Sequence, residues 1–142
     1  MKAIRIAAFA GGTAAVAAII TTIASADQIS HLLTSAYSYP NPSGTSLGEA
    51  ASSTLTYLFA TAGVAVLASL ISFSDTVSQS RAGRWTGGVL IAVGFAVAIF
   101  NAAQPEFPPA VKLVFFLPPV VGALWLGLAT RRRAEPRTSR AL

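Results

Sequence analysis

The sequence has no cysteine, a single histidine and few charged residues, and each scarcity excludes something. Among its 142 residues, 11% are charged and 54% are hydrophobic, a balance far from that of a soluble domain. Without cysteine the chain can form neither a disulfide nor a thiolate or cysteine-ligated metal site. His31 is the only histidine, so we expect no metal site, since such sites need several ligands.

Charge is absent from four long apolar runs, which cover residues 6–25, 50–73, 87–103 and 113–130. Each run has about the 20 residues that a helix needs to cross roughly 30 Å of hydrocarbon. A charged residue at the centre of such a helix would cost about 2.5–3.5 kcal/mol on insertion scales. The sequence therefore predicts an all-α polytopic membrane protein, a bundle of four transmembrane helices that forms one domain over residues 1–130.

The lack of charge within the runs also argues against two functions. A pump or proton-coupled exporter is expected to hold an ionisable residue within a span, and none is present. An enzyme needs an acid, a base, a nucleophile or a metal, and the candidates are scattered: His31, Glu49, Tyr57 and Glu106. No P-loop, nucleophile-elbow or zincin pattern occurs. We therefore expect no cofactor and lean away from an enzyme.

The basic residues lie mainly in three segments. All but Lys112 are in the amino terminus, the second connection or the tail: Lys2, Arg5, Arg81, Arg84, Arg131, Arg132, Arg133, Arg137 and Arg140. Four spans place those segments on one face, so the positive-inside rule predicts cytoplasmic termini and a plasma-membrane protein. We interpret Arg81, Arg84 and Arg131–Arg133 as topology anchors, with anionic lipid headgroups as the alternative. The net charge of +5 then needs no nucleic acid, and the tail, 131–142, is expected to be disordered.

The amino-terminal run allows two interpretations. Together with Ala24-Ser25-Ala26 it looks like a secretory signal with an A-x-A cleavage site. The run is about 19 residues long, however, whereas the apolar region of a signal has about 7–15. We favour a retained first helix, and cleavage after Ala26 would leave three spans.

The longest connection, residues 27–48, is extracytoplasmic in this topology. Apolar residues recur in it at helical spacing, at Ile29, Leu32, Leu33, Ala36 and Tyr37. This pattern predicts a short amphipathic helix at the membrane interface.

Polar side chains gather near the extracytoplasmic ends of the runs. Thr54, Tyr57 and Thr61 fall on one stripe of a helix, and Pro118-Pro119 predicts a kink that frees carbonyl groups. Polar groups at this depth are tolerated where protein buries them or where they line a water-filled cavity. We therefore hypothesise an outward-facing polar recess. Its candidate lining residues are His31, Glu49, Thr54, Tyr57, Thr61, Asn101 and Gln104. The alternative is a dry bundle in which these groups satisfy one another.

Two functions remain open. The first is a small non-catalytic integral membrane protein, an accessory or structural subunit that packs against a larger membrane complex or forms a homo-oligomer. The second is a binder, carrier or small membrane enzyme for an apolar molecule that enters the recess. The lipid bilayer is a partner in both. We favour the first because it requires no binding or catalytic role for any particular side chain.

Overall fold

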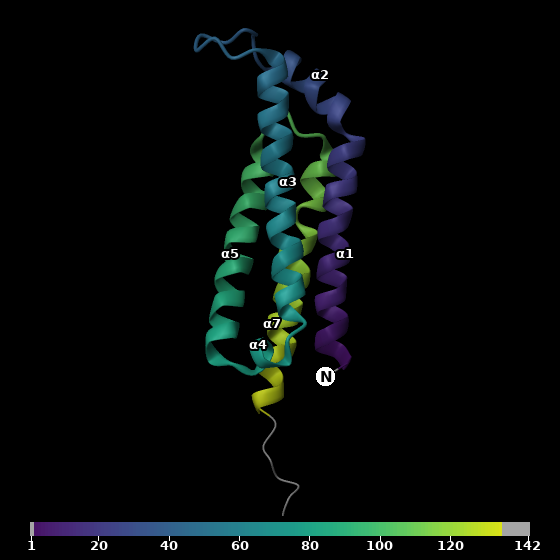
Figure 1. Cartoon of the computed structure of the whole chain (residues 1–142), viewed down its shortest axis with the longest axis vertical. Coiled ribbons are helices and arrows are strands. Elements are labelled where there is room, and N and C mark those ends of the chain that lie inside the picture. Colours follow the sequence, from purple (N-terminus) through teal and green to yellow (C-terminus); the bar gives the residue numbers. More distant parts are fainter. Residues whose placement is uncertain (1, 135–142) are drawn as a thin grey trace, which may run out of the picture.

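A computed structural model describes residues 2–134, and the elements in that range are all helices. They are α1 (Lys2–Ala24), α2 (Ala26–Ala36), α3 (Leu47–Ser72), α4 (Asp75–Gln79), α5 (Arg81–Ala103), α6 (Pro109–Val114) and α7 (Leu117–Ala134). Four segments are long and apolar enough to cross a membrane: α1, α3, α5 and the stretch Pro109–Arg131 (Figure 1). This confirms the prediction of a helical fold with four helices long and apolar enough to span a membrane. The tail predicted to be disordered is 131–142; its first four residues, 131–134, are instead helical and form the end of α7, and residues 135–142 lie outside the described residues.

Capping residues, rather than hydropathy, determine where two of the spans begin. Ser46 and Glu49 form a capping box at the start of α3, in which the Glu49 N–H donates to Ser46 Oγ at 3.3 Å. The Glu49 carboxylate in turn accepts from the Ser46 N–H at 2.8 Å. Ser80 caps α5 by accepting from the Gly83 N–H at 2.8 Å. These bonds satisfy donors that a helix start leaves open, so both helices begin before the apolar run does.

The last span is broken between α6 and α7, at Phe115 and Phe116. Pro118 has no N–H, so it cannot donate to the carbonyl of Val114 one turn earlier. The expected kink takes the form of a two-residue turn between α6 and α7, in which the Phe116 N–H donates to the carbonyl of Leu113 at 3.1 Å.

The long helices pack unequally. α1 lies against both α3 and α7, whereas α5 packs mainly on α7 and touches α3 little. In Figure 1 the α2 helix and the connection 37–46 lie together at one end. We call this the loop end. The opposite end, where α1 begins, carries Lys2, Arg5, Arg81, Arg84 and Arg131, and we call it the basic end.

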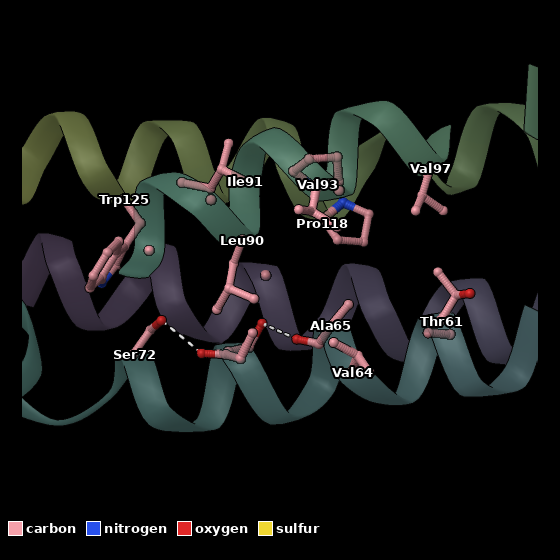
Figure 2. Close-up of a pocket in the computed structure, with 18 of the residues that line it drawn as sticks. Thr61, Val64, Ala65, Ser72, Leu90, Ile91, Val93, Val97, Pro118 and Trp125 are labelled. Atoms are coloured by element: carbon pink, nitrogen blue, oxygen red, sulfur yellow. Dashed lines mark hydrogen bonds between the residues drawn. The ribbon is translucent and has the colours of Figure 1, made fainter. Parts of the chain in front are cut away.

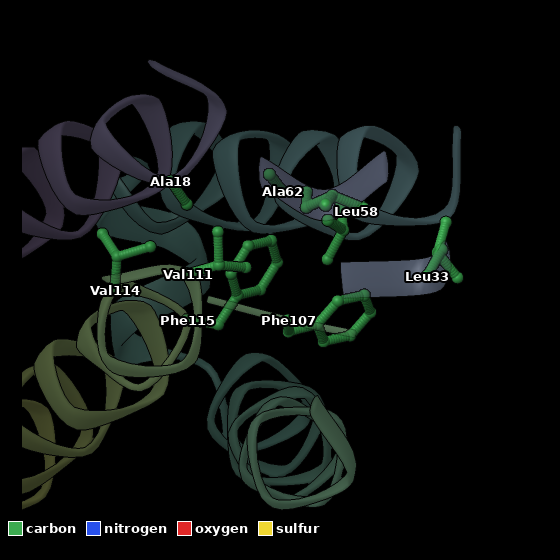
Figure 3. Close-up of a cluster of buried hydrophobic side chains, with 9 residues drawn as sticks. Ala18, Leu33, Leu58, Ala62, Phe107, Val111, Val114 and Phe115 are labelled. Carbon is green, nitrogen blue, oxygen red and sulfur yellow. The ribbon is translucent and has the colours of Figure 1, made fainter. Parts of the chain in front are cut away.

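Two buried apolar clusters hold the bundle, one toward each end. The loop-end core contains Ala18, Ile29, Leu33, Leu58, Ala62, Phe107, Val111, Val114 and Phe115 (Figure 3). The basic-end core contains Ile4, Ala8, Trp125 and Ala129. Ile29 and Leu33 come from α2, so the apolar side of this short helix packs into the bundle, while His31 on the same helix is exposed.

Candidate functional site

A cavity of about 300 Å³ lies between α1, α3, α5 and α7. It begins near Thr61 and Val97 and extends toward the basic end as far as Ser72 and Trp125 (Figure 2). Its position follows from the packing, because α3 and α5 diverge and touch each other little. Space remains where these two helices would otherwise meet.

Two glycines on α5 allow this helix to pack closely on α7, whereas it makes few contacts with α3. A Cβ atom added at Gly87 would come within 3.0 Å of the Trp125 ring on α7. A Cβ at Gly94 would lie 3.2 Å from the Cβ of Pro119, also on α7. Missing side chains at these two positions let the α5 and α7 backbones approach closely. The close contact is made on the α7 side, so the side of α5 toward α3 is left open.

Hydroxyl groups on the cavity wall are already satisfied by their own helix. Thr61, Ser69 and Ser72 donate to the carbonyls four residues earlier, at 2.8, 2.9 and 2.7 Å. Such local bonds use the hydroxyl donor without a partner from another helix. The rest of the wall is mainly alanine, glycine and valine residues, with Leu90 and Ile91 among the larger ones. The wall is therefore predominantly apolar.

Trp125 closes the cavity at the basic end and is only 3% exposed. Its indole N–H is buried and has no acceptor among the described residues. An unpaired buried donor destabilises a protein by about 1–3 kcal/mol, so this N–H is an unusual feature. We did not single out Trp125 from the sequence. The available signal is its position inside an apolar run, away from the interfacial belt in which tryptophan is usually found.

Two of the predicted recess residues form a polar bridge between α3 and α5. The Tyr57 hydroxyl donates to Asn101 Oδ1 at 2.9 Å, and Asn101 is fully buried. Tyr57 lies one turn from Thr61, and Asn101 one turn from Val97, so the bridge lies next to the loop-end limit of the cavity. The Asn101 Nδ2 group has no acceptor within the described part of the chain.

The remaining recess candidates are spread over the loop end. Glu49 belongs to the capping box of α3, His31 is exposed, and Thr54 and Gln104 are half-buried. Thr61 is the recess candidate that lines the cavity. The wet, outward-facing recess itself stays a prediction.

The predicted anchor residues divide into two groups. Arg81 and Arg84 lie in the first turn of α5, and Arg131 is exposed near the end of α7. The side chains of Arg132 and Arg133 lie outside the described part of the structure. Between residues 2 and 134, no group of three His, Asp or Glu side chains lies close enough to hold a metal ion.

The described residues form a helical bundle with four helices long and apolar enough to span a membrane and with an apolar cavity between them. No family model, curated protein or solved structure matches this chain.

Proposed function

We propose that this protein binds a slender apolar molecule in the cavity between α3 and α5. The supporting observation is an apolar cavity that reaches the side of the bundle. Its wall includes Val64, Leu90 and Val93, which remain 57%, 41% and 54% exposed. Because these residues lie within candidate spans, the opening faces hydrocarbon in a bilayer. A guest would enter sideways from the lipid.

The size of the cavity selects the kind of guest. At about 300 Å³ it lies at the lower limit of ordinary ligand sites, which span roughly 300–1,000 Å³. From Thr61 to Ser72 the α3 wall is about 16 Å long, at about 1.5 Å per residue. A single hydrocarbon chain or a narrow ring system is a guest of this size.

Tryptophan fluorescence tests this proposal. In a Trp85→Phe protein, Trp125 is the remaining tryptophan and lies at the end of the cavity. A brominated alkane added to the protein in mild detergent should quench its emission saturably. Ala65→Phe, which places a ring in the cavity, should abolish the saturable part, whereas Ala60→Phe on the exposed side of α3 should not. Quenching that rises without saturation, equally in both variants, would show general partitioning and overturn the proposal.

An accessory or structural subunit is the second candidate, and the exposure of α5 favours it. Only Ala98 and Asn101 are buried along its 23 residues. Another membrane protein, or a second copy in a homo-oligomer, could cover the remaining apolar surface. Such a subunit should co-purify with its partner in mild detergent, whereas a stand-alone binder should migrate at the mass of one chain.

We also propose that the basic end is cytoplasmic and that the protein resides in the plasma membrane. The loop end carries Asp27, Glu49 and Glu106, and the positive-inside rule places the cations in the cytoplasm. The cysteine-free sequence makes a labelling test direct. A membrane-impermeant maleimide should label Ser43→Cys in intact cells and leave Thr76→Cys unlabelled. The reverse pattern would invert the topology.

The polar recess can be tested by the same chemistry. A water-filled recess open to the loop end should allow an impermeant thiol reagent to label Thr54→Cys and Thr61→Cys. Val66→Cys serves as the control within the same helix. Equal lack of labelling at all three positions would mean a dry bundle, with lipid as the route into the cavity.

A further inference from the structure

A second concave site lies between α5 and α7, on the side of α5 toward Leu126. It is a groove of about 710 Å³. Arg81, Arg84 and Trp85 line its mouth at the basic end, and Val89, Ala92 and Leu126 line it further along. It is independent of the cavity between α3 and α5 and does not depend on the function proposed above.

The groove changes from cationic to apolar along its length. Arg81 is exposed, and the Arg84 guanidinium donates to the carbonyl of Gln79 at 3.2 Å, which leaves its other donors available. Trp85 is 69% exposed beside them, as tryptophans at a membrane–water interface are. The Thr130 hydroxyl, also on the wall, is bonded to carbonyls of its own helix. Beyond the two arginines, the wall therefore offers mainly apolar contact.

The length of the groove matches one leaflet. From Arg81 to Ala92, the α5 wall is about 16 Å long at about 1.5 Å per residue. Half of a hydrocarbon core that is roughly 30 Å thick is about 15 Å. A lipid with its headgroup at the arginines could therefore place an acyl chain along the groove at the same depth and in the same direction as in a leaflet of the bilayer.

We infer that this groove binds one anionic phospholipid. Arg81 and Arg84 hold the phosphodiester through charge-assisted hydrogen bonds, for which the guanidinium fork is well matched. Val89, Ala92 and Leu126 contact one acyl chain. The apolar wall selects a lipid over a soluble phosphate, and the two cations select an anionic headgroup over a zwitterionic one.

Trp85 reports on occupancy of the groove. In a Trp125→Phe protein it is the remaining tryptophan, and the protein can be placed in phosphatidylcholine vesicles that contain brominated phosphatidylglycerol. Quenching should exceed that given by the same fraction of brominated phosphatidylcholine. Arg81→Gln with Arg84→Gln should lower the preference roughly tenfold, which corresponds to about 1.4 kcal/mol.

A matched variant separates a site from general attraction. Lys2→Gln with Arg5→Gln removes the same charge from the same end of the bundle, on α1, and should leave the preference unchanged. An equal fall in both double variants, or no preference in the parent, would overturn the inference. Excess inorganic phosphate should not compete. Competition by it would show that a soluble anion, rather than a lipid, occupies the arginines.

Discussion

Replacing Trp125 separates the role of its ring from that of its unpaired N–H. In Trp125→Ala the ring is lost from a position that is 3% exposed. The added empty volume is on the order of 100 Å³, which at about 24 cal/mol per Å³ predicts a destabilisation of about 2.4 kcal/mol. The transfer part of a usual core truncation is largely absent, because lipid is as apolar as the core. Trp125→Ala also removes the unpaired N–H, which relieves about 1–3 kcal/mol, so the expected loss is well below the 3–5 kcal/mol or so typical of soluble proteins.

Trp125→Phe should behave differently, because it keeps a ring and removes only the N–H and part of the indole. The N–H has no acceptor among the described residues, so its removal relieves a cost of about 1–3 kcal/mol. That gain offsets the smaller ring, and the net change should be within about 1 kcal/mol of zero. Both variants can be compared by SDS titration in mild detergent, with Trp85 emission as the reporter. A Trp125→Phe protein destabilised by more than about 2 kcal/mol relative to the parent would mean that the N–H is hydrogen-bonded, and the reasoning would be refuted.

Three further predictions concern other contacts. Gly94→Ala should destabilise by about 1–3 kcal/mol, because its new methyl group meets a rigid proline ring on α7 at 3.2 Å. The control is Gly63→Ala on α3, where a new methyl group meets nothing within 4 Å and should stabilise the protein by roughly 0.5–1 kcal/mol through helix propensity. The same SDS titration measures the two variants, and equal effects would contradict the close packing of Gly94 on α7. Tyr57→Phe removes the 2.9 Å hydrogen bond to Asn101 on α5. The interaction should contribute about 0.6 kcal/mol to stability, measured as the coupling energy in a double-mutant cycle that pairs Tyr57→Phe with Asn101→Ala. Partial burial, then the nearby Glu106 carboxylate, raises the pKa of Tyr37 above 10.0. Because the raised pKa favours the protonated phenol in the folded state, it stabilises the fold fully below that pH, and this stabilisation is lost as the pH rises through the folded-state pKa. NMR titration of the tyrosine rings should show a lower pKa for Tyr37 in Glu106→Gln than in the parent. An unchanged pKa would exclude the carboxylate as a cause.

The four spans could be predicted because their signal is local. Each apolar run reports the solvent around its own helix, and no tertiary information is needed. The starts of the helices were missed by several residues at Leu47 and Arg81, since a hydropathy run excludes the polar caps that begin a helix. The break at Phe115 was placed closely, because proline acts on the turn immediately before it.

The cavity could not be predicted, because it depends on how helices diverge. Polar side chains near the loop end suggested a wet recess, yet the Thr61 hydroxyl is bonded to its own backbone and carries no information about water. The cavity instead results from the fit of Gly87 and Gly94 against α7, which draws α5 away from α3. Glycine in an apolar run shows that some close contact exists, but not with which helix. The bond between Tyr57 and Asn101 is of the kind expected in the dry-bundle alternative, because a buried amide needs a partner.

The break in the last span has a mechanical consequence. α6 supplies Val111 and Val114 to the loop-end core, whereas α7 supplies Trp125 and Ala129 to the basic-end core. This span is interrupted between the two cores by the turn at Phe115 and Phe116. Substitutions in different cores should then be additive in their free energies of unfolding, as for distant sites. The unbroken helix α1 supplies Ala18 to the loop-end core and Ile4 and Ala8 to the basic-end core, so α1 is the rigid connection between the two ends.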